Sequence, residues 1–558
     1  MREGTNFMRL KSYLMIISTT TLGVSATHAS QSKDVKKIDS AIIEQSSDFL
    51  KNFNAHPANA FSELKTYNEI AEMGSKAAWN EKTRSPASVP SEALMSIEYR
   101  EMRDRFLNAK TDADIASLMN DLTDPAKFSK FPRDLQFFAA RVRPVKAFAG
   151  MVYRMQKITS RTRMAQEMAL GALRGILEQI HIRFADLGID GSEDLHAVAL
   201  FQYLTKPQAG YLSVCESEAS LQNYFASHIY NEIKESAKII EGMNLSDPIV
   251  MDAKLRFGID SFGSAKNMQR FHFIGEGEKF AILARMHRRM AGLATFVAFD
   301  FRGFVDYRKE LGQKYGWDVG NIFTPIGGLT REERVNVTKA GKFRKDFPNL
   351  FALKSTPTVK YEGPYAPLKD KMIPIGQSWT MAAYQHFHLS VGYVESAWKA
   401  FQNKEHGSSF VVDNELFEAQ SDEITETIAN MRGLTASLAD AKSEFTLYSK
   451  VKKKAITVNF REFFVKPPQS LNDLLPTSFA KGEAGANSDS LVTRTVAGQK
   501  VSYRDYERGR AIGWNKKVYS NLFPEILNDK AQVDDYQGAL ISSRGGRMVS
   551  TALMSFVR

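Results

Sequence analysis

Apolar residues recur at helical spacing through the first half of the chain. From about residue 36 to residue 245, glycine and proline are sparse, and short polar breaks separate the apolar segments. The clearest segment runs from Arg161 to Phe184, and its apolar side chains repeat so that they share one helical face: Leu170, Leu173, Leu177, Ile180 and Phe184. Such a stripe predicts amphipathic helices that pack on a core.

The pattern changes in the second half. Residues around 280–311 predict another long apolar helix, and further helices are expected from about 378 to 401 and from about 414 to 442. Before these later helices, residues 340–376 contain five prolines, which predict an extended, loop-like linker: Pro348, Pro357, Pro364, Pro367 and Pro374.

The last hundred residues show strand spacing. Ile456, Val458 and Phe460 alternate with polar residues, and residues 491–496 and 500–506 flank a turn-like segment at 497–499. We therefore expect a mainly α protein, a multi-helix array or bundle with a smaller mixed α/β C-terminal region. The expected domains are residues 30–245 (helical), 246–450 (helical, including the linker at 340–376) and 451–558 (mixed).

Residues 1–29 have the composition of a secretory signal peptide. Arg9 and Lys11 precede a short uncharged run, and small residues follow it. The run is shorter than the ~20 residues that span a bilayer, so we expect cleavage after Ala29 or Ala26 rather than an uncut membrane anchor. The mature chain would then be exported across the inner membrane and be periplasmic or secreted, with no transmembrane segment.

The net charge adds a constraint on partners. The chain has 74 Lys and Arg against 63 Asp and Glu, a surplus of +11. Residues 1–29 carry three basic side chains and one acidic one, so the mature surplus falls to +9. This balance favours anionic partners such as phospholipid head groups. For an exported protein we expect the partner to be an anionic envelope surface or an envelope protein, and not nucleic acid. The alternative is that the charge surplus only keeps the protein soluble.

Cysteine usage excludes one class of protein. Cys215 is the single cysteine of the chain. An intrachain disulfide framework is therefore excluded, and a large core must supply stability. We expect Cys215 to be a small buried apolar residue rather than a nucleophile.

A basic run between residues 141 and 166 contains no acidic residue. If it forms a basic amphipathic helix, four of its side chains are candidates for contact with an anionic surface: Arg154, Lys157, Arg161 and Arg163. The alternative is a core helix with a solvated basic face. Pro144 is expected to break the front of this helix and to push Arg143 out of helical conformation.

Asp300 and Arg302 lie within an otherwise apolar stretch, from residue 290 to residue 305. A buried charge is costly without a partner, so both are candidates for a buried ion pair between helices. The alternative is a functional carboxylate in a cleft.

Metal-like spacings are present but weak. Glu178/His181 and Glu193/His196 have the Glu-x-x-His spacing of di-iron bundles, yet the first pair falls on the polar stripe of its predicted helix. His386 and His388 would point apart on a helix. Ser478-Phe-Ala-Lys481 matches a serine-hydrolase tetrapeptide without its partner motifs. We therefore expect no metal and no cofactor.

No motif is specific enough to name a reaction, and no catalytic residue is assigned. The expected function is non-catalytic: an exported, mostly helical protein that binds an anionic surface or a protein partner. The alternative is a helical hydrolase that acts on an envelope polymer or lipid, with histidine or carboxylate chemistry.

Overall fold

The computed structural model describes sixteen stretches of the chain: residues 65–82, 90–159, 195–208, 214–252, 271–307, 347, 349–402, 421–439, 444–449, 453–474, 477–480, 492–496, 499–503, 510–513, 515–529 and 533–543. Helices dominate these residues, and the strands form only two-stranded sheets. The predicted mainly α fold with a smaller mixed C-terminal region is confirmed. The predicted signal peptide at 1–29 and the helix at 161–184 lie outside the described residues.

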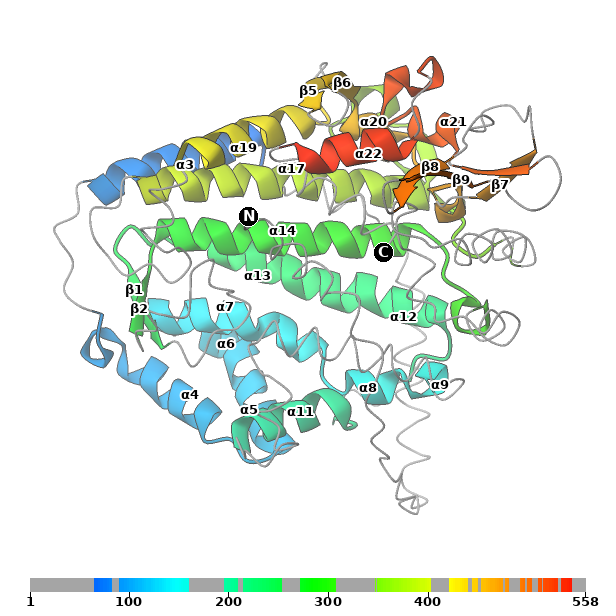
Figure 1. Cartoon of the computed structure of the whole chain (residues 1–558). Coiled ribbons are helices and arrows are strands. Elements are labelled where there is room, and N and C mark those ends of the chain that lie inside the picture. Colours follow the sequence, from blue (N-terminus) through cyan, green and yellow to red (C-terminus); the bar gives the residue numbers. More distant parts are fainter. Residues whose placement is uncertain are drawn as a thin grey trace.

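Two long buried helices form the centre of the molecule (Figure 1). Helix α14 (Glu276–Ala298) and helix α17 (Ile375–Gln402) run side by side, and both are buried on nearly all sides. Glu278 caps the start of α14, because its carboxylate accepts a hydrogen bond from the Gly275 amide at 2.9 Å. A helix that is apolar around most of its circumference must be covered by other elements.

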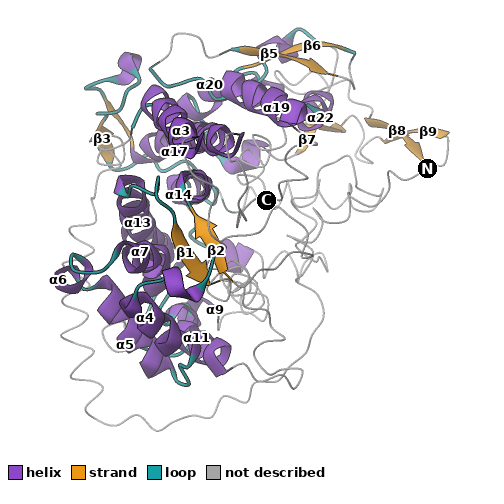
Figure 2. Ribbon diagram, turned by 90° about the vertical axis from the view of Figure 1, so that its left-hand side faces the viewer, coloured by secondary structure: helices purple, strands orange, loops and turns teal. Residues whose placement is uncertain are grey.

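The covering elements form further layers, which are clearest along the helix axes in Figure 2. Helices α3 (Tyr67–Lys82) and α19 (Ser421–Leu434) pack on α17, and helix α13 (Tyr230–Gly242) packs between α14 and α7 (Arg133–Ala147). Shorter helices between residues 92 and 229 accompany α7: η2 (Glu92–Leu94), α4 (Ile97–Leu107), α5 (Asp112–Thr123), α6 (Pro125–Phe128), α8 (Met151–Arg154), α9 (Gln156–Thr159), α11 (Leu195–Thr205), α12 (Glu218–Tyr224) and the π-helical segment η4 (Phe225–Ile229).

The sheets are antiparallel pairs. They are β1 (Ile249–Asp252) with β2 (Phe271–Ile274), β3 (Thr358–Lys360) with β4 (Met372–Pro374), β5 (Phe445–Ser449) with β6 (Lys454–Val458), β7 (Thr477–Ala480) with β10 (Arg510–Gly513), and β8 (Val492–Val496) with β9 (Gln499–Tyr503). The remaining short helices are η9 (Ala366–Leu368), α20 (Phe460–Val465), η10 (Leu471–Leu474), α21 (Lys516–Tyr519), η11 (Pro524–Leu527) and α22 (Val533–Ser542).

The structure confirms several local predictions and corrects one. Ile456 and Val458 are buried in β6, and β8 and β9 form the expected hairpin, with Val496 opposite Gln499. The predicted helix near 378–401 is α17, whereas the one near 414–442 is the shorter α19. In the described part of the proline-rich segment, β3, η9 and β4 replace the expected loop-like linker, because Val359 and Ile373 bury their side chains against the core.

The apolar helix predicted around 280–311 is interrupted. Helix α14 ends at Ala298, and Phe299 is extended and forms a bridge to Leu353. The carbonyl of Asp300 then accepts a hydrogen bond from the Phe351 amide at 2.6 Å. The backbone groups near Phe299 therefore pair with a distant segment instead of continuing the helix.

Pro144 lies inside α7, so the prediction that it pushes Arg143 out of the helix is wrong. A proline lacks the amide that would bond to the carbonyl four residues earlier, here Ala140. The hydroxyl of Ser236, on the neighbouring helix α13, donates a hydrogen bond to that carbonyl. The tertiary contact therefore compensates for the missing helical bond.

One connected hydrophobic core runs through all these layers, from Ile70 to Leu540. It crosses residues 245 and 450, where domain boundaries are predicted, and those boundaries stay predictions. In the described part of the chain, no helix has both the length and the apolar character needed to span a membrane.

Candidate functional site

The basic run does not form one continuous helix. After α7, Gly150 adopts a left-handed conformation (φ 62°), and the short helices α8 and α9 follow. Arg154 is only 3% exposed, and its guanidinium lies 4.6 Å from the ring centroid of Tyr224. Arg154 therefore lies inside the protein with its charge against the Tyr224 ring, and it is not part of an exposed basic face.

Lys157 differs from Arg154. Its side chain is exposed, and its amine lies 2.5 Å from a carboxylate oxygen of Glu216. Arg161 and Arg163 lie outside the described residues. Contact of Lys157 with an anionic surface stays a prediction, since a solvent-exposed ion pair is weak enough to exchange partners.

Asp300 and Arg302 pair with each other. Arg302 Nε lies 2.7 Å from one carboxylate oxygen of Asp300, and its NH2 group contacts the same carboxylate. Asp300 is buried, but the side chain of Arg302 is 68% exposed. The pair therefore closes a turn just after α14 and does not join two helices. Lys354 lies nearby, and burial lowers its pKa to about 8 despite the carboxylate of Asp300.

The metal-like spacings are not brought together among the described residues. Glu178, His181 and Glu193 lie outside them, and His196 lies in α11. His386 and His388 point apart on α17, as predicted, since His388 bonds to the carbonyl of Thr435 and His386 faces α13 and α14. Within the described ranges, no group of three or more metal-ligating side chains is found.

A different arginine cluster lies where α7, α13 and α14 meet. Arg141 extends from α7 and is 8% exposed. Ser236 of α13 marks the junction: its hydroxyl contacts the Ala140 carbonyl and lies 4.0 Å from the sulfur of Met286 on α14. Arg285 and Arg289, one helical turn apart on α14, are partly exposed.

The electrostatics of this cluster are unusual. Burial, together with the positive charges of Arg289 and Arg285, lowers the pKa of Arg141 to about 9. Among the described residues, no hydrogen bond or ion pair is made by the Arg141 guanidinium. Two residues later on α7, the guanidinium of Arg143 is paired with Glu232 at 2.5 Å. An anion placed at Arg141 would accept charge-assisted hydrogen bonds from the guanidinium, for which the described residues supply no acceptor.

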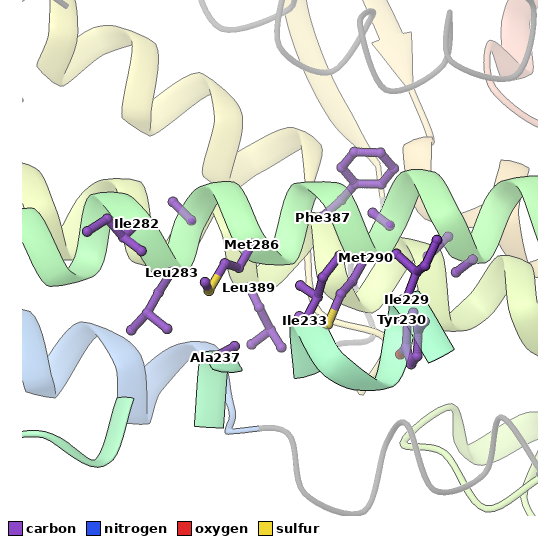
Figure 3. Close-up of a cluster of buried hydrophobic side chains, with 14 of the residues drawn as sticks. Ile229, Tyr230, Ile233, Ala237, Ile282, Leu283, Met286, Met290, Phe387 and Leu389 are labelled. Atoms are coloured by element: carbon purple, nitrogen blue, oxygen red, sulfur yellow. The ribbon is translucent and has the colours of Figure 1, made fainter. Parts of the chain in front are cut away.

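A second polar group lies on the other side of α14. The Nδ1 atoms of His287 (α14) and His386 (α17) are 3.0 Å apart, and the hydroxyl of Tyr230 (α13) lies 2.6 Å from Nε2 of His386. Buried side chains of the same three helices, among them Ile233, Met290 and Leu389, belong to the hydrophobic cluster that Figure 3 shows.

Burial keeps both imidazoles neutral. It lowers the pKa of His287 to about 3 and lowers the pKa of His386 well below its ordinary value, with a further contribution to His386 from His287 and Lys234. Because the pair is buried and neutral, its two facing nitrogens can share one proton. A substrate could reach these nitrogens only by passing through the core.

Neither group is visible in the sequence as a motif. Arg141 is separated from Arg285 by a long segment of chain, and His287 is 99 residues from His386. Helical periodicity predicts which face each residue occupies, but it does not tell which helices become neighbours. The sequence carries only a weaker signal: a polar residue within a strongly apolar helix needs a partner, but the sequence does not say which residue that partner is.

Comparisons with known proteins identify no relative: no family model, curated protein or solved structure matches this chain.

Proposed function

We propose that this protein is a non-catalytic binding protein for an anionic group, with Arg141 as the central contact. The observation that carries the proposal is a buried guanidinium without a described carboxylate partner, close enough to Arg285 and Arg289 of α14 to feel their positive charges. The binding of an anion, as predicted from the basic charge balance, is retained, but the contact moves from Arg154 to Arg141.

The physical argument concerns the cost of a buried charge. Removing a cation from water without a partner is expensive, and a bound anion offsets that cost. Guanidinium presents five N–H donors in a planar fork that suits phosphate and carboxylate oxygens. Arg285 and Arg289 would extend the positive field along α14 and attract the same ligand.

The ligand class is therefore a phosphate or carboxylate group. Its source would be a free anion or the head group of an anionic lipid, which agrees with the proposed export of the mature chain to the envelope. The predicted hydrolase is not favoured by a particular observation, since the histidines that converge in the described residues form a buried neutral pair.

Calorimetric titration with inorganic phosphate tests this proposal, with chloride at equal ionic strength as the reference anion. We expect one phosphate per chain and at least tenfold weaker binding by Arg141→Met, because a charge-assisted hydrogen bond contributes about 1.5–3 kcal/mol. Without phosphate, Arg141→Met is expected to unfold at a higher temperature than the parent protein, because a buried unpaired charge is removed.

Arg143→Met is the matched control. It removes the same charge from the same helix, but from a side chain that is already paired with Glu232, and should leave phosphate affinity within about twofold. Flotation with phosphatidylglycerol or phosphatidylcholine vesicles, with and without phosphate, separates a lipid head group from a free anion. Equal phosphate binding by the parent and Arg141→Met, or binding by neither, would contradict the proposal.

A further inference from the structure

The facing imidazoles of His287 and His386 have room for one proton between them. At 3.0 Å, one Nδ1 must donate and the other must accept. The hydroxyl of Tyr230 can donate to Nε2 of His386, which leaves Nδ1 of His386 to donate to Nδ1 of His287. A chain of hydrogen bonds thus connects α13, α17 and α14 as long as one of the two facing nitrogens carries no proton.

A second proton has no place in this arrangement. If both rings are protonated, both facing nitrogens carry hydrogens, and two cations meet at hydrogen-bond distance in a buried site. The bond between α14 and α17 is then replaced by repulsion. The two helices are among the most deeply buried in the molecule, so water cannot screen this repulsion unless they separate.

The surroundings offer little compensation for added charge. From α13, Lys234 adds positive charge near His386, and Glu241 accepts a hydrogen bond from the hydroxyl of Tyr393. From α17, the Tyr393 ring stacks on His287, with centroids 5.2 Å apart. Among the described residues, no carboxylate accepts a hydrogen bond from His287 or His386.

Two further groups of charged residues near the helix pair have their described interactions with each other and not with the facing histidines. On α3, Tyr67 bonds to Glu395, which also pairs with Arg432 of α19 and with Lys399. On α14 itself, the charges of Arg285 and Arg289 act on Arg141.

We propose that His287, His386 and Tyr230 form an acid-sensitive latch that holds α14 against α17 and α13 at neutral pH and releases them when both imidazoles are protonated. The latch is separate from the proposed anion contact: the two use different side chains, and the latch does not require a ligand.

The sign of the pH dependence follows from proton linkage. The closed state keeps both imidazoles neutral, whereas the open state binds protons with ordinary histidine affinity, near pH 6.5. The open state therefore takes up more protons below pH 6.5, and the closed state loses stability as the pH falls. With two linked protons, the ratio of closed to open molecules should fall by up to about a hundredfold for each unit by which the pH is lowered.

Hydrogen exchange measured by mass spectrometry between pH 7 and pH 4.5, corrected for the intrinsic exchange rate, tests the latch. In the full chain, peptides from α14 and α17 should lose protection as the pH falls, before peptides from α5 do. The double variant His287→Gln/His386→Gln carries neutral amides that can bond to each other at any pH, and should stay protected over the same range. His388→Gln, which changes a buried histidine on α17 outside the pair, should keep the opening and its two-proton steepness.

Opening of the double variant at the same pH as the parent protein would overturn the proposal. So would loss of protection in α14 and α17 only together with α5, since that is global unfolding. If the double variant does not fold, the unmodified protein still decides: ring resonances of His287 and His386 that titrate near pH 6.5 while α14 and α17 stay protected exclude the latch.

Discussion

Arg141 and Arg143 extend from the same helix into opposite surroundings. Arg143 is half-buried and has Glu232 as its partner, whereas Arg141 is buried beside other arginines. The two positions, two residues apart, differ by about 200° around a helix. A single helix can therefore hold one arginine that is paired with a carboxylate and another that has no described partner, and composition alone does not separate them.

Cys215 is a second residue whose surroundings decide its chemistry. The prediction that it is buried is confirmed, at 6% exposure. Burial raises the pKa of the thiol to about 11, although the charge of Arg154 and a hydrogen bond with Ser220 act in the opposite direction. The thiolate is the reactive form, so little of it is present at neutral pH.

We expect Cys215 to react with a maleimide slowly in the native protein. At pH 8, a thiol with a pKa near 11 is a thiolate on the order of 10²-fold less often than free cysteine. The second-order rate should rise by at least that factor in guanidinium chloride, as measured by mass spectrometry of quenched samples. Native labelling as fast as that of the unfolded chain would show that this thiol is exposed and ionised.

At the scale of elements, α7 shows how a helix accommodates an internal proline. Ser236 of α13 donates to the Ala140 carbonyl, which Pro144 leaves without its helical amide partner. Both Ser236 and Ala140 are fully buried. The hydrogen bond therefore satisfies a group that water cannot reach, and its loss should be costly.

We predict that Ser236→Ala lowers the free energy of unfolding by about 1–3 kcal/mol, the cost of an unsatisfied buried carbonyl. The effect should shrink when Pro144 is also changed to Ala, because the restored amide can bond to Ala140. Chemical denaturation of the four proteins of this cycle measures the coupling.

Ser227→Ala is the control for this cycle, because that hydroxyl bonds only to the Asn223 carbonyl of its own helical turn. It should change stability by less than about 0.5 kcal/mol, as an ordinary surface substitution does. Identical losses for Ser236→Ala with and without Pro144 would mean that the hydroxyl does not substitute for the missing amide.

At the scale of the whole molecule, α3 joins the beginning of the described chain to α17. The hydroxyl of Ser396 donates to the Ile70 carbonyl at 2.8 Å. Gly74, one turn later on α3, allows this close approach, since a Cβ there would lie 2.6 Å from the Cα of Ser396. Segments more than 300 residues apart therefore share one core.

Gly74→Val should loosen this junction. The new side chain would overlap backbone atoms of α17, and overpacking of this kind costs about 1–3 kcal/mol or more. Thermal unfolding should occur at a lower temperature, and exchange should increase in α3 and α17.

Gly292→Ala is the matched control, because a Cβ at this helical position meets nothing within 4 Å. It should be neutral or stabilise the protein by up to about 1 kcal/mol, the helix-propensity difference between the two residues. If Gly74→Val were as stable as Gly292→Ala, the close contact between α3 and α17 would not exist in solution.

The sequence by itself determined the local features of this protein. Periodicity indicates α17 and the opposite directions of His386 and His388, and two-residue alternation indicates β6, because each depends on neighbours a few residues apart. The tertiary structure alone decided that Ser236 supports Pro144, that His287 faces His386, and that Arg141 rather than Arg154 is the buried arginine without a described partner. These outcomes depend on which helices pack together, and that choice is made by the shape and burial of the whole core.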